Sequence, residues 1–473
     1  MAKLKNYNGR YCESEYESAF IAFLQSVGWT YLPGNKIKRC YRDVLIADDF
    51  RAFITKANTD LLEEEIEQIY DTVRLVGAES DFATLHKVYK WMVDGIQFTP
   101  QSGLPIQVTL IDFETPENNI FHVVNQLTVD YINNGQRENR RPDVLLYVNG
   151  MPLCIIELKN PADSHSTIYD AWEQITIRYW RDIPHLLHYC PLACISDGVK
   201  TRLGTVRTPY EHFYAWRRVN DADKISTMPF AETETMIKGV YAPERFLEIF
   251  RDYIYFQDEI FDCDEREIVC RYPQFFAVRL LKQSIIKSVM EQTGKGGTYF
   301  GATGCGKTYT MAFLARQLAL RCSDIPEIGS PTIVMIVDRD ELQEQGIKLF
   351  AKSKEFLNLG EVSIVKSRNN LRQELGSRES GGFYICTIQK FCDRKEDKIG
   401  LINDRHNIIC FSDEAHRTQL EHSRKIQFSK DADENMKAMV SKPYAKVLKE
   451  AFPHATFVGF TGTCLLYTSP SPR

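Results

Sequence analysis

The spacing of hydrophobic residues predicts short helices and strands in the first half of the chain. Apolar positions three and four residues apart indicate helices, and Gly28 ends the first of them. Continuous or alternating apolar runs indicate strands. The predicted helices lie at residues 13–28, about 58–75 and about 168–182, and the predicted strands lie at 106–114, at 120–129, within 141–161 and at 192–198. Together these elements predict a compact α/β domain over residues 1–215.

From about residue 271 the pattern changes to apolar strands that alternate with helices. Such alternation favours a parallel, doubly wound sheet, so we predict a second α/β domain over residues 266–464. Residues 216–265 combine short helical patterns with acidic turns, and we predict a helical connector there. Residues 465–473 have no periodicity, and we interpret them as a non-native or misread tail.

The composition narrows the functional classes. The chain has 473 residues, of which 44% are hydrophobic, so most of it is expected to fold around real cores. The formal net charge of −5 means that any contact with nucleic acid needs a local basic groove. The 13 cysteines lie mostly within apolar runs, which favours reduced thiols in a cytoplasmic protein. No signal peptide and no membrane-spanning run is visible, so we expect no membrane partner.

Two histidines and two cysteines lie close together in the sequence and are residue types that bind zinc, but their spacing is not that of a zinc site. His185, His188, Cys190 and Cys194 lie close together in the sequence. Their spacing matches no common zinc site, and the segment reads as the core between a helix and a strand. We therefore predict no zinc there.

The segment RPDVLLYVNGMPLCIIELKNP, residues 141–161, predicts two strands around a tight turn at Asn149 and Gly150. Asp143 opens the first strand, and Glu157 and Lys159 end the second. Two carboxylates and a lysine are the groups that a Mg²⁺-dependent nuclease needs to hold the metal ion and to orient water. The alternative is a strand that simply ends in solvated charges.

The geometry of this hairpin makes a further prediction. With a two-residue turn, Asp143 and Glu157 would point to opposite faces, because side chains alternate along a strand. An odd loop or a β-bulge would bring them to one face, and Lys159 shares the face of Glu157 in either case. We therefore predict an odd loop or a bulge.

A phosphate-binding motif follows in the second half. GATGCGKT, residues 301–308, lies between a short strand and a helix, where glycines let backbone N–H groups turn toward phosphate oxygens. Lys307 is predicted to reach the β and γ phosphates, and the Thr308 hydroxyl to bind Mg²⁺. An ordinary glycine-rich turn is the alternative. The predicted nucleotide contacts in this motif are Gly301, Thr303, Gly304, Gly306, Lys307 and Thr308.

An acidic motif about a hundred residues later completes the nucleotide site. The apolar strand in NIICFSDEAHRTQ, residues 407–419, ends at Asp413. Carboxylates at the carboxyl end of a parallel strand lie where such sheets bind ligands. Asp413 is predicted to hold Mg²⁺ through water, Glu414 to orient the attacking water, and His416 to sense the state of the nucleotide.

These motifs together resemble those of superfamily 2 helicases. The resemblance implies that Gln274 in RYPQFFAV reads the adenine edge of ATP. It implies DNA-backbone contacts by Arg339 in IVMIVDRDELQEQ and by Thr387 and Gln389 in ICTIQKF. The segment FVGFTGT resembles the motif that couples hydrolysis to strand movement. The coupling residues implied there are Thr461, Gly462 and Thr463.

The first half resembles PD-(D/E)xK nucleases through Pro142-Asp143 and Glu157-x-Lys159. The resemblance implies that Glu17, in the first helix, assists metal binding. The family's Gln-xxx-Tyr element is matched by Gln174, but Arg178 stands where the tyrosine is expected and Tyr179 lies one place later. The resemblance thus gives a supporting role to Gln174 and leaves Tyr179 without one.

With both halves in this order, the chain resembles the restriction (R) subunit of type I restriction-modification enzymes. The implied fold is α/β: a PD-(D/E)xK nuclease domain followed by the first RecA-like lobe of a helicase motor. ATP and Mg²⁺ are the implied cofactors, with Asp143, Glu157, Thr308 and Asp413 as metal ligands. Implied partners are double-stranded DNA and the methyltransferase (M) and specificity (S) subunits. S-adenosylmethionine would act only through the M subunit, and the location would be the prokaryotic cytoplasm.

Two departures and two alternatives accompany this resemblance. Cys464 follows Thr463 where the family pattern expects a proline, and the second motor lobe is not in the sequence, so we interpret the chain as C-terminally truncated. Another nuclease–helicase, such as a type III restriction subunit or a repair enzyme, is one alternative, although type III enzymes place the nuclease after the motor. A fragment that only binds DNA or partner subunits is the other.

Overall fold

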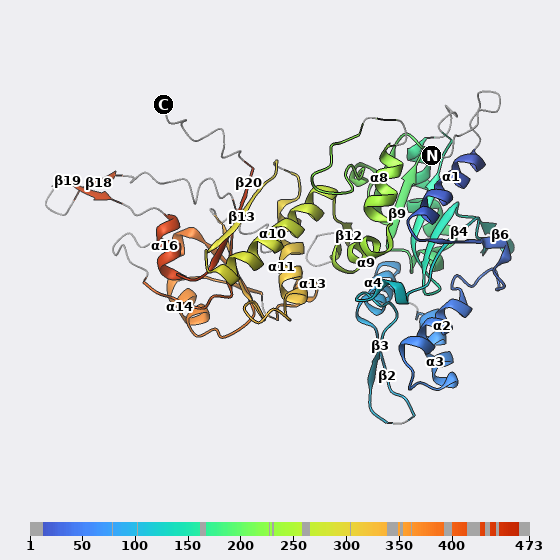
Figure 1. Cartoon of the computed structure of the whole chain (residues 1–473), viewed down its shortest axis with the longest axis horizontal. Coiled ribbons are helices and arrows are strands. Elements are labelled where there is room, and N and C mark those ends of the chain that lie inside the picture. Colours follow the sequence, from blue (N-terminus) through green and yellow to red (C-terminus); the bar gives the residue numbers. More distant parts are fainter. Residues whose placement is uncertain are drawn as a thin grey trace. The chain divides into compact units, whose positions relative to one another are not determined.

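The computed structural model of the chain has two compact units, Met1–Tyr272 and Pro273–Arg473 (Figure 1). Each unit is described by itself. The structure describes residues 13–77, 79–101, 103–160, 167–226, 228, 231–257, 265–302, 304–337, 349–350, 353–360, 362–391, 400–413, 426–430, 436–440 and 444–462.

The first unit is built on a mixed six-stranded sheet in the order β1-β4-β7-β8-β9-β10. The pairs β1/β4 and β8/β9 are parallel and the other pairs are antiparallel. Every residue of the central strands β7 and β8 is buried, which explains their continuous apolar runs. The strands are β1 (Thr30–Pro33), β4 (Phe121–Asn125), β7 (Val144–Val148), β8 (Met151–Leu158), β9 (Leu192–Ser196) and β10 (Thr201–Thr205).

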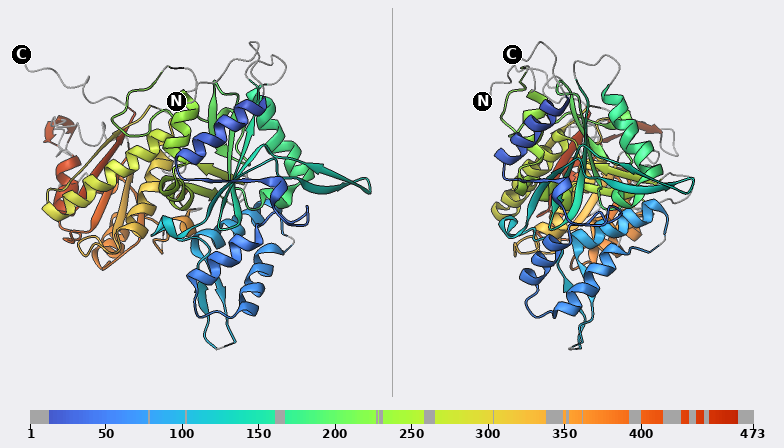
Figure 2. Two further views of the ribbon diagram at one scale, coloured as in Figure 1. Left: turned by 45° about the vertical axis from the view of Figure 1, so that its right-hand side comes forward. Right: turned by 90° about the vertical axis from the view of Figure 1, so that its right-hand side faces the viewer.

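Helices cover both faces of this sheet. α1 (Glu13–Ser26) packs on β1, β4 and β8, and α5 (Ile168–Glu173) packs on β8 and β9. α5 continues through the π-helical turn η3 (Gln174–Tyr179) into α6 (Trp180–Asp182) and is followed by α7 (Pro184–Leu187). In Figure 2, α1 in blue and the α5 region in green lie on either side of the strands.

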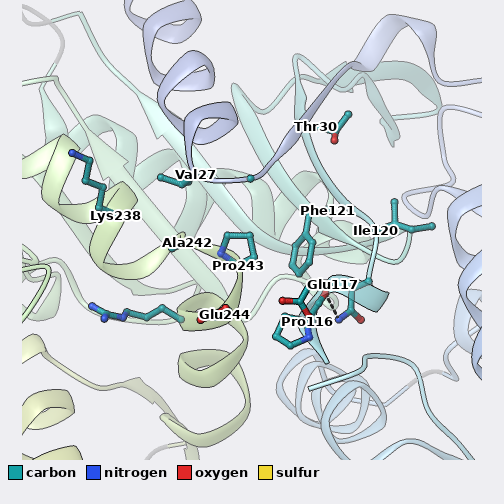
Figure 3. A pocket seen from close by; sticks show the side chains of 13 residues that line it. Val27, Thr30, Pro116, Glu117, Ile120, Phe121, Lys238, Ala242, Pro243 and Glu244 are labelled. Carbon is teal, nitrogen blue, oxygen red and sulfur yellow. Dashed lines mark hydrogen bonds between the residues drawn. The ribbon is translucent and has the colours of Figure 1, made fainter. Parts of the chain in front are cut away.

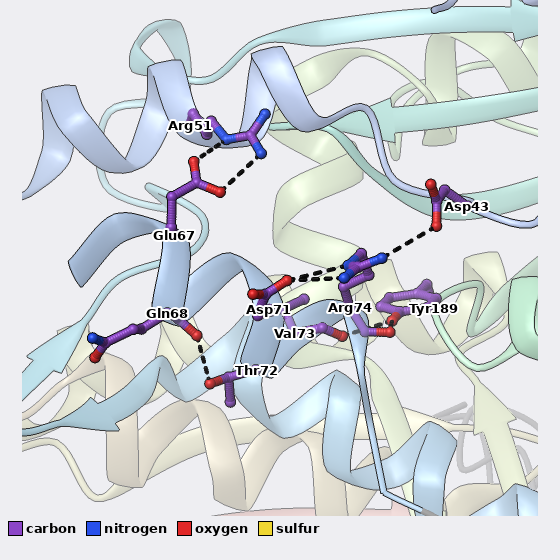
Figure 4. A network of polar contacts seen from close by, with 9 residues as sticks. All are labelled: Asp43, Arg51, Glu67, Gln68, Asp71, Thr72, Val73, Arg74 and Tyr189. Atoms are coloured by element: carbon purple, nitrogen blue, oxygen red, sulfur yellow. Dashed lines mark hydrogen bonds and ion pairs between the residues drawn. The ribbon is translucent and has the colours of Figure 1, made fainter. Parts of the chain in front are cut away.

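A helical layer beside the sheet is fixed by polar contacts. It consists of α2 (Ala47–Ala57), α3 (Glu63–Arg74) and α4 (Asp81–Asp94). Arg51 of α2 forms a two-pronged ion pair with Glu67 of α3 (Figure 4). The Tyr189 hydroxyl donates to the Val73 carbonyl at 2.6 Å, which ties the end of α3 to the segment before β9. Two peripheral hairpins and three 3-10 turns are further elements of this unit. The hairpins are β2 (Ile96–Phe98) with β3 (Ile106–Val108) and β5 (Val129–Asn133) with β6 (Gln136–Arg140), and the turns are η1 (Gly34–Lys36), η2 (Pro116–Asn118) and η4 (Tyr210–His212).

The β7–β8 hairpin contains the predicted bulge. Asn149 and Gly150 form a two-residue turn with φ of 52° and 78°, the combination that a type I′ turn requires. Leu146 pairs with Cys154 and Tyr147 pairs with Pro152, so Leu153 has no partner on β7. This extra residue is a β-bulge. The sequence argument left a choice between an odd loop and a bulge, and the structure has the bulge.

The turn of this hairpin is buried against α2. A Cβ atom on Gly150 would lie 2.3 Å from the Ile46 carbonyl oxygen, so only glycine fits. The Asn149 side chain donates to the Leu110 carbonyl at 2.9 Å and accepts from the Ile120 N–H at 2.8 Å. These contacts anchor the turn, and they therefore also fix the register of the hairpin at its other end, where Asp143 and Glu157 lie.

Two predicted strands are shorter than expected. The segment 106–114 forms a strand only at β3, Ile106–Val108. The segment 120–129 is interrupted after β4, because Gln126 adopts a left-handed backbone with φ of 49°. The hydrophobic pattern of this segment does not reveal the break, because the strand ends through the backbone conformation of a polar residue.

Residues 216–265, which we predicted to be a connector, contain regular elements and belong to the first unit. They include α8 (Ala231–Val240), α9 (Pro243–Asp252) and β11 (Ile254–Gln257), which pairs with β12 (Arg266–Val269). The Trp29 indole donates to the Tyr241 carbonyl at 2.6 Å, and the Tyr89 hydroxyl donates to the Phe250 carbonyl at 2.9 Å. The domain limits drawn from the sequence stay predictions.

Glu267 of β12 is buried, and burial raises the pKa of its carboxyl well above the usual range against smaller opposing effects of Thr205 and Arg207. The unfolded chain ionises this group near pH 4.3, so the folded state loses stability as the pH rises above that value. We therefore expect Glu267→Gln to raise the free energy of unfolding by at least about 1 kcal/mol at neutral pH and to change it little near pH 4.

Thermal melts across this pH range check that prediction. Glu211→Gln, at an exposed position of η4, is the matched control and is expected to melt like the wild type. An equal melting temperature for Glu267→Gln and wild type at neutral pH would show that the buried carboxyl carries no such cost.

The second unit contains an all-parallel six-stranded sheet in the order β13-β20-β17-β14-β16-β15, which confirms the predicted parallel sheet. One face is covered by a core that includes Leu371, Leu375, Leu448 and Phe452. The strands are β13 (Lys295–Phe300), β14 (Thr332–Val337), β15 (Val362–Ile364), β16 (Phe383–Thr387), β17 (Ile408–Ser412) and β20 (Thr456–Thr461). The helices are α10 (Tyr272–Glu291), α11 (Lys307–Arg321), α13 (Lys354–Leu357), α14 (Arg368–Gly376), the 3-10 turn η5 (Ile388–Phe391) and α16 (Tyr444–Ala451); β18 (Ile426–Lys430) and β19 (Met436–Val440) form a separate hairpin.

Candidate functional site

The bulge in β8 brings the predicted catalytic groups of the first unit together. Asp143, just before β7, faces Glu157 near the end of β8, and the Asp143 N–H lies 3.4 Å from Glu157 Oε1. The Leu158 N–H donates to Asp143 Oδ2 at 2.9 Å. Lys159 follows β8 directly, with its Nζ 3.9 Å from Glu157 Oε2. Two carboxylates and one ammonium group therefore share one side of the sheet.

The surroundings of Glu157 disfavour its charged form. Burial raises its pKa well above the usual range, and the negative charge of Asp143 raises it further, while Lys159 opposes both. A divalent cation between the two carboxylates would offset that repulsion. Mg²⁺ suits such a donor set, because it commonly takes one or two carboxylates and completes its shell with water and phosphate oxygens. In the part of the chain that the structure describes, no group of three or more His, Cys, Asp or Glu residues could hold a metal ion.

Tyr179 belongs to this site, contrary to the doubt that its position in the sequence raised. Residues 174–179 form a π-helical turn, whose i to i+5 spacing places Gln174 and Tyr179 on the same side. The Tyr179 hydroxyl donates to Glu157 Oε1 at 2.8 Å. Gln174 Nε2 donates to Glu157 Oε2 at 2.8 Å and contacts the Tyr179 hydroxyl at 2.7 Å. The extra residue that displaced the tyrosine in the sequence is absorbed by the wider turn.

Gln174 also connects the acid to the lysine. Its Oε1 accepts a hydrogen bond from Lys159 Nζ at 3.0 Å, while its Nε2 donates to Glu157. Burial raises the pKa of Tyr179 well above its usual range, and the charge of Glu157 adds to this, so the tyrosine remains a donor. The network fixes the orientation of Glu157 and Lys159 before any ligand binds.

The phosphate-binding motif of the second unit has the expected local structure. β13 leads into the loop and α11 begins at Lys307, with Gly304 and Gly306 at φ of 80° and 85°. Lys307 Nζ lies 3.4 Å from the Gly301 carbonyl, so the side chain folds back over the loop. Gln274 of α10 donates from Nε2 to the Gly306 carbonyl at 3.1 Å. Thr308 lies in the first turn of α11.

The other described candidates of this unit lie at the ends of neighbouring strands. Asp413 follows β17, and its N–H donates to the Ile336 carbonyl at 2.9 Å. Thr461 ends β20 and its carbonyl accepts from the Gly301 N–H at 3.0 Å, with Gly462 next to it. Thr387 ends β16 and Gln389 lies in η5. Because all six strands are parallel, these carboxyl ends meet at one edge of the sheet, where such sheets bind ligands. Thr303, Arg339, Glu414, His416, Thr463 and the predicted tail 465–473 lie outside the described residues.

Comparison with known proteins decides the family. Residues 10–212 match the family model of the type I restriction enzyme R protein N terminus, and residues 273–471 match that of the SWI2/SNF2 ATPase. The endonuclease subunit of the type I restriction enzyme HindI from Haemophilus influenzae is 31% identical over 469 residues, which cover 95% of this chain and 42% of that protein. The chain belongs to the R-subunit family of type I restriction enzymes.

Further relatives agree with this family. The protein named as the MjaIXP endonuclease subunit of Methanocaldococcus jannaschii is 29% identical over 485 residues, covering 96% of this chain and 42% of that protein. The R-subunit chain thus spans about two fifths of the length of the curated relatives it matches. A solved HsdR fragment from Vibrio vulnificus YJ016 covers 73% of this chain and 51% of that chain with 14% identity and a TM-score of 0.24, too low to support a structural argument.

Gln126 is a residue of the R-subunit site that sequence reasoning missed. Its side-chain Nε2 donates to Glu17 Oε2 at 2.7 Å and lies 3.2 Å from Asp143 Oδ1. Its backbone N–H donates to the Asp143 carbonyl at 3.0 Å. Asn125 holds the other oxygen of Glu17 at 2.6 Å. Glu17, which we predicted to assist metal binding, is therefore connected to Asp143 through Gln126. In the sequence, the only sign of this connection is the pair of polar residues Asn125 and Gln126 at the end of an apolar segment.

A cavity of the first unit lies away from these groups. It has a volume of about 770 Å³ and is lined by residues from the end of α1, the start of β4 and the α8–α9 region (Figure 3). None of the predicted site residues lines it. Its Lys238 pairs with Glu234 at 2.6 Å, and its Arg245 donates to the Val219 carbonyl. The candidate chemistry of the R-subunit chain thus lies at Asp143 and Glu157.

Among the described helices of the R-subunit chain, none is long and apolar enough to cross a membrane.

Proposed function

We propose that this chain provides the nuclease domain and the first motor lobe of an ATP-driven DNA translocase that cleaves unmodified double-stranded DNA. The observation that carries the proposal is the hydrogen-bonded group of Asp143, Glu157, Lys159, Gln174 and Tyr179 on one side of the sheet. It combines metal-binding carboxylates with a lysine that is already oriented. This is the arrangement that Mg²⁺-dependent phosphodiester hydrolysis needs.

In the nuclease domain, Asp143 and Glu157 would hold Mg²⁺, which supplies charge stabilisation and a more acidic water when bound. Lys159 orients the attacking water and stabilises the negative charge that develops on the phosphate. Gln174 and Tyr179 keep Glu157 and Lys159 in position, because each donates to Glu157 and Gln174 also accepts from Lys159. Gln126 links Glu17 to Asp143 and keeps their carboxylates apart.

In the motor lobe, the N–H groups of the loop at 301–306 and the start of α11 would bind the phosphates of ATP. Lys307 would exchange its contact with the Gly301 carbonyl for the β and γ phosphates. Thr308 and Asp413 would hold the Mg²⁺ that accompanies ATP. The hydrogen bond between Gly301 and Thr461 connects the phosphate-binding loop to the coupling segment at Thr461 and Gly462, so a change in the loop on nucleotide binding would reach that segment.

The proposed partners follow from the family. DNA would be the substrate, and the M and S subunits would provide methylation and sequence recognition, with S-adenosylmethionine bound by the M subunit. Arg339, Thr387 and Gln389 would contact the DNA backbone, Gln274 the adenine, and Glu414 and His416 the hydrolytic water and the nucleotide state. The nuclease domain precedes the motor in this chain, which favours a type I over a type III enzyme.

Plasmid cleavage by the full-length subunit, assembled with its M and S subunits, tests the proposal. We expect linearisation of unmethylated plasmid only when both ATP and Mg²⁺ are present, and no cleavage after chelation with EDTA. Methylated plasmid is the matched control and should remain intact. Cleavage without ATP would exclude a translocation-dependent nuclease, and absence of cleavage under all conditions would favour a binding role only.

Replacing Tyr179 with phenylalanine removes only the hydroxyl and therefore tests its contribution to cleavage. The variant loses one hydrogen bond to the buried Glu157 but keeps the ring packing. We expect the cleavage rate to fall about 10-fold, with ATP turnover unchanged, because an oriented donor to a buried carboxylate is worth about 1.5 kcal/mol. Tyr169→Phe, at an exposed position before the turn, serves as the control. Wild-type cleavage by Tyr179→Phe would reduce Tyr179 to a packing residue.

A further inference from the structure

A basic pocket opens beside the candidate nuclease site. We propose that it binds a backbone phosphate of DNA next to the phosphate that is cleaved, with Arg141 as the principal contact. The assignment rests on the proposed nuclease function and adds to it a substrate-binding site that the motifs do not include.

The lining of the pocket is suited to an anion. Its volume is about 300 Å³, and its described lining residues include three arginines and no carboxylate. The lining residues are Asn139, Arg140, Arg141, Gln174, Arg178 and Tyr179. Arginine is well matched to phosphate, because its planar guanidinium can donate two parallel hydrogen bonds to phosphate oxygens.

The three arginines are not equivalent. Arg140 pairs with Asp182 at 2.7 Å and lies over the ring of Tyr131 at 5.3 Å, so it forms a fixed wall. Arg178 pairs with Glu173 at 3.1 Å at the surface. Arg141 is exposed and makes no hydrogen bond or ion pair with any residue that the structure describes. Among the described residues, none therefore competes with a ligand for the charge of Arg141.

The position of the pocket relates it to cleavage. Arg141 lies two residues before Asp143 in the sequence. Gln174 and Tyr179 line the pocket and also donate to the two oxygens of Glu157. An extended polyanion could therefore place one phosphate at the carboxylates and another at Arg141. A phosphodiester chain has this repeat of charge, whereas a single free phosphate would occupy only one of the two places.

Binding of a short fluorescent DNA duplex to the 473-residue chain tests the assignment, with Ca²⁺ in place of Mg²⁺ and no ATP. Anisotropy titrations from about 50 to 200 mM salt give both the affinity and its salt dependence. We expect Arg141→Ala to weaken binding about 10-fold and to lower the slope of log affinity against log salt by about 0.9, the value of one phosphate contact. Arg141→Lys should keep the slope and recover only part of the affinity, because it retains the charge but not the two-pronged geometry.

Arg137→Ala is the matched control. Arg137 lies on β6, four residues before Arg141, is 66% exposed at its side chain and is not among the described residues that line the pocket. Arg137→Ala should leave the slope of log affinity against log salt unchanged. If Arg137→Ala and Arg141→Ala had equal effects, the loss of affinity would reflect the overall positive charge of this surface, and the assignment of Arg141 would be wrong. Inorganic phosphate should compete only weakly, and competition at low phosphate concentrations would assign the pocket to a free anion instead.

Two failures can be told apart. If the wild-type chain binds no DNA, both the proposed function of this unit and the pocket assignment are wrong. If the wild type binds DNA and Arg141→Ala binds it with the same affinity and salt slope, only the pocket assignment is wrong.

Discussion

Lys159→Ala is expected to abolish DNA cleavage by the full-length subunit in its complex while ATP turnover continues. Lys159 is almost fully buried beside Glu157 and is held by Gln174. Its removal takes away the cation that orients water and stabilises the developing charge, which we expect to lower the cleavage rate by roughly 10³-fold. Plasmid linearisation and phosphate release, measured in the same reaction, give the two rates.

The control for this variant is Lys200→Ala, an exposed lysine between β9 and β10. It should cleave and hydrolyse like the wild type. A melting temperature near that of the wild type would show that Lys159→Ala folds. If Lys159→Ala still cut DNA at a comparable rate, the group around Glu157 would not be the nuclease site.

Lys307→Ala is expected to stop ATP hydrolysis and, with it, cleavage. Gly304 and Gly306 have positive φ just before α11, and under the proposed function Lys307 is the charge that would reach the β and γ oxygens. Losing this charge should lower the ATPase rate by about 10²-fold or more. Cleavage should fall to the same extent if cutting follows translocation.

The matched control is Lys287→Ala on α10. The Lys287 side chain is 72% exposed and pairs with Glu291 one turn away. It should retain both activities. Cleavage that persisted in Lys307→Ala while ATP hydrolysis was lost would separate the nuclease from the motor and contradict the coupled mechanism.

The parts of the site that the sequence predicted correctly are those set by local rules. Side chains alternate along a strand and an Asn-Gly turn has a known length, so the hairpin around Asn149 required a bulge or an odd loop before Asp143 and Glu157 could face each other. The parallel sheet was likewise predictable, since apolar strands alternate with helices along this part of the sequence.

The parts that were missed depend on contacts through space. Tyr179 was left without a role because Arg178 stands where the family pattern expects the tyrosine, whereas the π-helical turn brings Tyr179 into contact with Glu157. Gln126 was read as part of a strand, although its left-handed backbone ends that strand and points its amide at Glu17 and Asp143. Arg141 has no motif of its own, and its significance comes only from the pocket that it lines.

The bulge at Leu153 limits which insertions and deletions the β7–β8 hairpin can accept in related proteins. Asp143 and Glu157 point to the same side of the sheet because the bulge adds one residue to β8. Adding or removing one further residue between them, with the turn unchanged, would move one of the two side chains to the opposite side. A single deletion that removed the bulge would turn Glu157 to the opposite side, away from Asp143, even though every motif residue remained. Insertions and deletions between the two acids should therefore be tolerated in homologues only in even numbers, or with a compensating change of the turn.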